Sequence, residues 1–155
     1  MLDQIQDPSN LGGIIRTAAW FGVKHIVSTK GTCDFFNPKS VSATAGSIFA
    51  LPLIASMTDA LDTVAYYESM GYDVFVTTLK ASELGLNCFL NSQKILLILG
   101  NEGAGVSKQI LDFISEQKHI TVLGNCTSVE SLNVVASVTA LLALYCHRNV
   151  LKKLP

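Results

Sequence analysis

The run I-L-L-I-L at residues 95–99 restricts the fold of this chain more than any other feature. Five consecutive aliphatic side chains leave no polar side to face water, which is typical of a strand buried on both faces of a parallel sheet. Three glycines follow at once in L-G-N-E-G-A-G, at Gly100, Gly103 and Gly105. Because such a strand needs helices on both sides, we expect an α/β protein.

The rest of the chain alternates between strand and helix patterns. Strands are predicted at residues 25–28, 49–54, 72–78 and 119–123, and Pro52 favours either an edge position or a strand end for the second of these. Helices are predicted at residues 11–21, within 37–46, and at 59–70, 107–114 and 131–147, with Gly22 ending the first and Thr58 capping the third. This order predicts a mostly parallel sheet with helices on both faces, and ligands beyond the carboxyl ends of its strands.

Composition limits the class of protein. The 155 residues suit a single domain, and only 15% are charged, against about 25% in ordinary proteins. Such a low charge content favours a homo-oligomer with an apolar interface. The longest nearly apolar run, 134–146, is shorter than the ~20 residues that span a membrane, and no signal peptide is visible. Four scattered cysteines and three histidines form no metal-ligand spacing, which predicts reduced, buried thiols in a cytoplasmic protein without metal.

Three polar segments lie where ligands are expected. In L-G-N-E-G-A-G the spacing of the glycines matches neither the dinucleotide-binding fingerprint nor a phosphate-binding loop. The segment is therefore either a tight turn or part of a site that contains Glu102. In D-P-S-N-L-G-G-I-I-R, Ser9 or Asn10 can cap a helix, the two glycines permit close packing, and Arg16 is either solvated or aimed at an anion. In S-V-E-S-L-N, a serine cap for the last helix and a polar site at its start are both possible.

The three segments together, in the forms N-L-G-G-I-I-R-T-A, L-G-N-E-G-A-G-V-S and V-E-S-L-N-V, form an ordered set. This set resembles the SpoU/TrmH-like RNA ribose 2′-O-methyltransferases of the SPOUT class, and the likeness runs over residues 3–148. The resemblance implies one catalytic domain over residues 1–155, with an α/β fold tied in a deep C-terminal trefoil knot. It also implies S-adenosylmethionine as cofactor, RNA as substrate and a cytoplasmic homodimer.

The resemblance also implies roles for particular residues. Ser131 and Asn133 would support Arg16, which would either take the 2′-hydroxyl proton with help from a phosphate or stabilise the developing alkoxide. The expected catalytic residues are Asn10, Arg16, Glu102, Ser131 and Asn133. The expected cofactor-binding residues are Thr78, Leu99, Gly100, Asn101, Gly103, Leu123 and Leu132.

Two departures from the family pattern affect these expectations. Gly124 stands where relatives often have proline, which would loosen the cofactor loop. The first motif comes so early that we expect no N-terminal RNA-binding domain in this chain. Either the chain is a truncated catalytic domain, or RNA contact relies on scattered bases (Lys24, Lys30, Lys39 and Arg148), and we expect weak, salt-sensitive RNA binding. Ribosomal RNA is favoured over transfer RNA. The alternatives are a catalytically silent knotted module that binds RNA or cofactor, and a small-molecule α/β enzyme.

Overall fold

The computed structural model describes residues 1–55, 59–79, 83–121 and 131–151, which form a parallel sheet with the strand order β3-β2-β1-β5-β4-β6. Every pair of neighbouring strands in it is parallel. The strands are β1 (Leu2–Asp3), β2 (Ile26–Ser28), β3 (Leu53–Ala55), β4 (Asp73–Thr77), β5 (Ile95–Gly100) and β6 (His119–Ile120). β3 lies at an edge, as predicted, but it begins after Pro52, so the prediction of a strand from residue 49 is wrong for residues 49–52.

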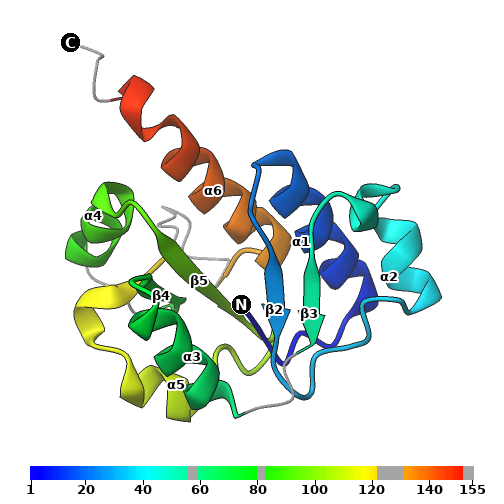
Figure 1. The fold of residues 1–155 in the computed structure, drawn as a ribbon, viewed down its shortest axis with the longest axis horizontal. Coiled ribbons are helices and arrows are strands. Elements are labelled where there is room, and N and C mark those ends of the chain that lie inside the picture. The colour runs from blue at the N-terminus through cyan, green and yellow to red at the C-terminus, as the bar shows by residue number, and fades with distance from the viewer. Residues whose placement is uncertain (56–58, 80–82, 122–130, 152–155) are drawn as a thin grey trace.

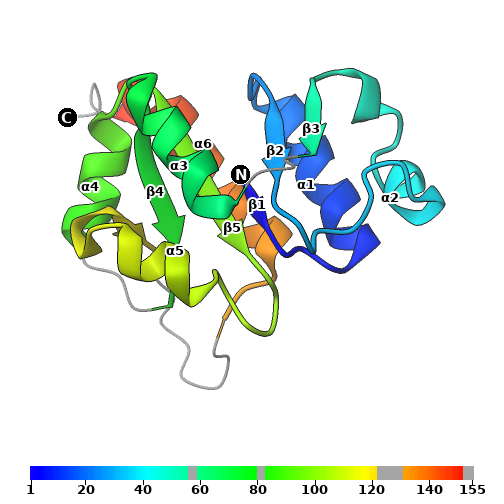
Figure 2. The same ribbon diagram turned by 60° about the horizontal axis from the view of Figure 1, so that its bottom comes forward.

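Helices cover both faces of the sheet (Figures 1 and 2). They are α1 (Pro8–Trp20), α2 (Pro38–Ala43), α3 (Ala60–Ser69), α4 (Glu83–Asn91), α5 (Lys108–Phe113) and α6 (Val134–Leu151), with the short 3-10 helices η1 (Ser47–Phe49) and η2 (Glu116–Lys118). α3 and α5 pack on one face, while α1, α4 and α6 pack on the other. The predicted α/β class is confirmed; the trefoil knot stays a prediction.

The central strand β5 divides the core in two. Ile98 is fully buried with Val64 and Ile110 on the face covered by α3 and α5. Its neighbour Leu99 is buried with Leu11 on the face covered by α1 and α6. The continuous apolar run therefore marks a strand with both faces buried, as predicted.

The helix caps differ from those predicted. α1 is capped by Asp7, whose carboxylate accepts the Ser9 N–H at 2.7 Å, rather than by Ser9 or Asn10. α3 is capped by Asp59, which corrects the choice of Thr58, a residue outside the described ranges. At the start of α6, Asn133 takes the place predicted for a serine cap and accepts the Val135 N–H at 2.8 Å. In each case a neighbouring side chain of similar capping ability holds the position.

Two glycines at the start of α1 allow close helix packing, as predicted. A Cβ atom at Gly12 would collide with Ala43 and the Ser40 carbonyl of α2, and one at Gly13 would press on Val135 of α6. The three helices α1, α2 and α6 therefore meet at closely packed backbone.

The remaining expectations concern thiols, membranes and metals. Cys33, Cys88 and Cys146 are free thiols, but the first two are only partly buried and Cys146 is exposed, so the prediction of buried thiols is wrong for these three. Cys126 lies outside the described residues. Within the described ranges, no helix is long and apolar enough to cross a bilayer. Over the same residues, no three His, Cys, Asp or Glu side chains are grouped to hold a metal ion.

Candidate active site

Three of the predicted site residues meet at the carboxyl-terminal edge of the sheet. Asn10 lies in the first turn of α1, Glu102 follows β5, and Asn133 directly precedes α6. The Asn10 amide donates to Glu102 Oε1 at 2.7 Å, and the Asn133 amide donates to Asn10 Oδ1 at 3.0 Å. Side chains that are separated by 92 and by 123 positions in the sequence are thus joined in one cluster.

The hydrogen bonds of this cluster have a fixed direction. The Val135 N–H at the start of α6 donates to Asn133 Oδ1, so the Asn133 NH2 group must point away from the helix, toward Asn10. Asn10 accepts that hydrogen bond with its oxygen, and its own NH2 group then faces Glu102. The orientation of both amides is therefore set by the helix end, and Glu102 is the ionisable group at the end of the chain of hydrogen bonds.

Arg16 lies outside this cluster, farther along α1. It borders a hollow of about 590 Å³ that is also lined by Thr17, Ala19, Trp20, Phe21, Thr44, Ala45, Ser47 and Thr139. The hydroxyls of Thr44, Ser47 and Thr139 donate to backbone carbonyls at 2.7 Å, and the Thr139 hydroxyl also lies 3.4 Å from the Thr17 hydroxyl. Among the described residues that line the hollow, Arg16 is the only charged one. The described lining therefore combines one cation with several hydroxyl-bearing residues and apolar groups.

The support expected for Arg16 takes a different form. Asn133 donates to Asn10 rather than to Arg16. Ser131 is exposed, and among the described residues no hydrogen bond links it to Arg16. The structure thus brings together Asn10, Glu102 and Asn133, and places Arg16 and Ser131 beside this group rather than within it.

The glycine loop after β5 folds back on itself. Asn101 and Gly105 form a short antiparallel bridge, and Asn101 Oδ1 accepts the N–H groups of Gly103 and Ala104 at 2.9 and 3.0 Å. A Cβ atom at Gly100 would collide with the backbone of Gly105 and Val106, so only glycine fits there. A Cβ atom at Gly103 would approach only Asn101 Oδ1, at 3.6 Å, so the space beside Gly103 is open.

The expected cofactor residues lie mostly around this loop. Leu99 and Gly100 are buried, whereas Leu132 is 51% exposed just before α6. The Thr78 N–H donates to the Ile120 carbonyl at 3.0 Å, at the end of β4. Leu123 and Gly124 lie outside the described residues. The prediction from sequence missed Asp3, a buried carboxylate under the loop that accepts the Ser107 N–H. The opening residues M-L-D-Q-I-Q-D contain two acids and two glutamines, so no local pattern singles out Asp3.

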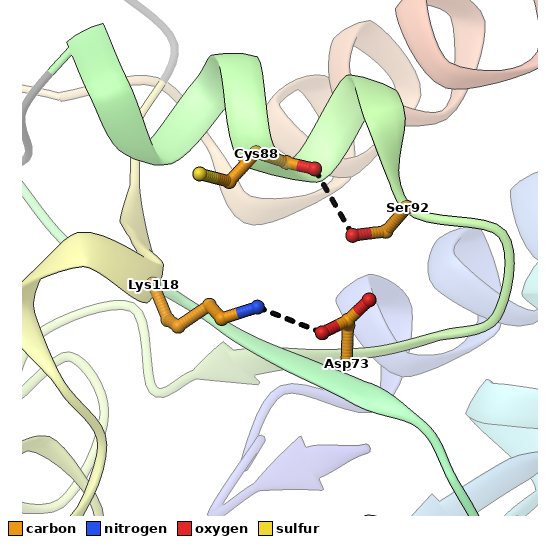
Figure 3. Close-up of polar contacts among 4 residues, drawn as sticks. All are labelled: Asp73, Cys88, Ser92 and Lys118. Carbon is orange, nitrogen blue, oxygen red and sulfur yellow. Dashed lines mark hydrogen bonds and ion pairs between the residues drawn. The ribbon is translucent and has the colours of Figure 1, made fainter.

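A second polar group lies at the opposite edge of the sheet, near the amino end of β4 (Figure 3). Lys118 Nζ pairs with Asp73 Oδ1 at 2.8 Å, and the Ser92 hydroxyl donates to the Cys88 carbonyl at 3.0 Å. The hydrogen bond from Lys118, with a smaller contribution from Ser92, lowers the pKa of Asp73. Because both charged side chains are partly exposed, the pair contributes at most about 1 kcal/mol to stability.

The model of the SpoU rRNA Methylase family matches residues 1–145, which include all three polar segments. The chain belongs to the SpoU rRNA Methylase family. The resemblance seen in the three motifs is thereby confirmed.

Individual members of the SpoU family are similar over most of this chain. It is 32% identical over 142 residues, 91% of its length, to the 23S rRNA (guanosine(2553)-2′-O)-methyltransferase RlmP of Bacillus subtilis, of which it covers 54%. The SpoU methyltransferase AviRb of Streptomyces viridochromogenes, solved in complex with AdoMet, superposes with a TM-score of 0.81 at 26% identity, over 96% of this chain and 59% of that one. An AdoMet-bound rRNA methyltransferase from Sinorhizobium meliloti gives a TM-score of 0.77 at 30% identity, over 96% of this chain and 55% of that one.

The chain spans about half the length of the curated relatives that it matches, 54% of RlmP and 50% of a Synechocystis relative. The family match over residues 1–145 includes the residues of the cluster described above.

Proposed function

We propose that this chain transfers a methyl group from S-adenosylmethionine to a ribose 2′-hydroxyl of RNA, with ribosomal RNA as the favoured substrate. The observation that carries the proposal is the cluster of Asn10, Glu102 and Asn133, in which three separate motifs meet at the ligand-binding edge of the sheet. Relatives named as 23S rRNA 2′-O-methyltransferases support the reaction and the class of RNA.

The described part of the site fits this cofactor. The sharp turn at Gly100, the open space beside Gly103 and the exposed apolar side chain of Leu132 offer backbone groups and an apolar surface at one edge. We expect this loop and the segment before α6 to hold the cofactor, with Leu123 contributing from outside the described residues. When bound, S-adenosylmethionine supplies a methyl group made electrophilic by its sulfonium.

We assign to Arg16 the activation of the ribose 2′-hydroxyl that accepts the methyl group. A guanidinium is protonated at ordinary pH, so it serves poorly as a base. Arg16 borders a hollow whose described lining contains no carboxylate, so its charge is available to an anion. It would stabilise the developing alkoxide electrostatically and bind the adjoining phosphate. A phosphate or a water molecule would take the proton of the hydroxyl. Asn10 and Asn133 orient Glu102 on the RNA side, and Ser131 lies exposed at the same edge. A 2′-hydroxyl as acceptor excludes DNA as substrate.

We also propose that the working form is a homodimer. Trp20 and Phe49 are 85% and 89% exposed, and Trp20 borders the hollow with the η1 residue Ser47. Exposed large apolar groups together with a charge content of only 15% favour burial against a second copy. We also expect weak, salt-sensitive RNA binding, because the net charge of the chain is −1. A cytoplasmic location is part of the proposal, and the free thiols of Cys33, Cys88 and Cys146 support it.

The experiment that tests the proposal locates the transferred label. The protein is incubated with methyl-labelled S-adenosylmethionine and unmodified ribosomal RNA, transfer RNA or a DNA of matching sequence, and the nucleic acid is digested to nucleosides. We expect labelled 2′-O-methylnucleosides from ribosomal RNA and none from DNA. Label on a base, or no label in any RNA, would contradict the proposed reaction.

A further inference from the structure

Asp3 is a carboxylate in the interior of the protein. Its side chain is 1% exposed, and the residue lies at the end of β1 beside Gly100 of β5. Burial of an ionised carboxylate is unfavourable unless hydrogen bonds compensate, and an apolar residue of similar volume often gives equal or greater stability. A carboxylate at this place therefore points to a role beyond packing.

Both oxygens of Asp3 hold neighbouring segments. Oδ1 accepts the Thr29 hydroxyl at 3.0 Å, at the end of β2, and Oδ2 accepts the Ser107 N–H at 2.7 Å. Ser107 is the N-cap residue of α5, but its own hydroxyl makes no capping bond and is buried without a partner among the described residues. The backbone hydrogen bond to Asp3 is thus the polar contact that fixes the far end of the glycine loop.

The near end of the loop is fixed by the next residue. Gln4 has a φ of 56°, in the left-handed region that is unfavourable for side chains other than glycine. In this conformation its N–H donates to Thr29 Oγ1 at 3.3 Å, and its carbonyl accepts the Asn101 amide at 3.0 Å. Two adjacent residues, Asp3 and Gln4, therefore hold both ends of the loop 101–107, and Glu102 lies between them.

We propose that Asp3 is a positioning residue for the methyl transfer: it fixes the loop 101–107 so that Glu102 stays within hydrogen-bonding distance of Asn10. Asp3 itself is buried and touches no substrate. The inference rests on the proposed function, since its effect is exerted through Glu102. It differs from a purely structural role because it predicts that the effect of Asp3 on turnover depends on Glu102.

The test combines two substitutions near the loop with one in the cluster. Asp3→Asn keeps the volume but loses one acceptor, and Thr29→Val removes the hydroxyl donor at nearly constant volume. Turnover, KM for RNA and Kd for S-adenosylhomocysteine are measured for each variant, alone and combined with Glu102→Gln. We expect Asp3→Asn to lower kcat by about 100-fold, as for a misplaced catalytic group, with KM for RNA little changed. In the Glu102→Gln background the loss should be much smaller.

Thr63→Val is the matched control, because Thr63 is also a buried threonine (6% exposed), and its hydroxyl donates to the Asp59 carbonyl at 3.1 Å, at the start of its own helix α3. It should leave kcat unchanged. If Asp3→Asn fails to fold, Thr29→Val decides the question by the same comparison. An equal loss of kcat in both backgrounds, or normal kcat in folded variants, overturns the inference. Methyl transfer by the unaltered protein is measured first, so its absence refutes the proposed function separately.

Discussion

The side-chain amide of Asn10 donates a hydrogen bond to Glu102 Oε1 at 2.7 Å, across 92 positions of sequence. Asn133 donates to the oxygen of the same amide, which keeps the Asn10 NH2 group directed at Glu102, and Asn133 is itself oriented by the first turn of α6. The helix start and the site are therefore not alternatives: the same side chain that caps α6 also orients the cluster.

Substitution of Asn133 separates these two roles. Asn133→Asp keeps an oxygen for the Val135 N–H, and aspartate caps helices as well as asparagine does, so the melting temperature should not fall. It cannot donate to Asn10, so one hydrogen bond of the cluster is lost and kcat should fall about tenfold, which corresponds to about 1.4 kcal/mol. Asn133→Ala is the comparison, since it loses both roles and should also lose about 1 kcal/mol of stability. Full activity in Asn133→Asp would show that the cluster is irrelevant to turnover.

The glycine loop offers a matched pair of positions. Gly100→Ala places a Cβ against backbone atoms of Gly105 and Val106, which only a shift of the loop can relieve. We expect a loss of about 1–3 kcal/mol in urea unfolding, together with weaker binding of S-adenosylhomocysteine. Gly103→Ala meets only Asn101 Oδ1, at 3.6 Å, and should change the unfolding free energy by no more than about 0.5 kcal/mol. Equal effects at the two positions would contradict the described loop geometry.

His25 predicts a dependence of stability on pH. Its Nε2 lies 2.7 Å from the Tyr67 hydroxyl, and burial, with a smaller contribution from the α-amino group of Met1, lowers the pKa of His25 below its usual 6.5. Because the folded state favours the neutral ring, this stabilisation is complete above the unfolded pKa and is lost as the pH falls through the folded pKa. Urea unfolding should therefore become easier below pH 6.5.

The variant His25→Phe should flatten this part of the pH profile, since it removes the titrating ring. Tyr66→Phe is the control, because Tyr66 is 60% exposed and its ring packs on Tyr67 without bonding His25. An unchanged pH profile in His25→Phe would assign the dependence to other groups.

The exposed Trp20 tests the proposed homodimer. Trp20→Glu puts a charge on the apolar surface beside the hollow and should convert a dimer into a monomer, as measured by light scattering after size-exclusion chromatography. Phe113→Glu is the matched control, since Phe113 is 49% exposed on α5, on the opposite face of the sheet. A dimer that survives Trp20→Glu, or a wild type that is monomeric, would refute this surface as the interface.

The architecture could be predicted from sequence wherever patterns were long. The run in β5 and the periodicity of α1 were sufficient, because burial of whole faces leaves a repeating signal. β1 was missed because two residues, Leu2 and Asp3, are too few for a period. α4 was missed because Gly85 lowers its helix propensity; there, glycine leaves room for the His119 carbonyl.

The site was predictable in its members but not in its contacts. The motifs selected Asn10, Glu102 and Asn133, yet the direction of their hydrogen bonds follows from which side chain caps α6, and Ser131 and Asn133 are both able to do so. Tertiary packing decides that choice, as it also decides that Asp3 lies under the glycine loop. Local patterns carry no information on either contact.

The central claim is tested most directly by methyl transfer with Arg16→Ala beside the wild type. Both proteins are given labelled S-adenosylmethionine and unmodified ribosomal RNA, and binding of S-adenosylhomocysteine is measured in parallel. We expect ribose label from the wild type, and loss of that label in Arg16→Ala with cofactor binding retained. Equal ribose label from both proteins would contradict the role of Arg16, and the absence of label from the wild type despite cofactor binding would contradict the proposed activity of this chain.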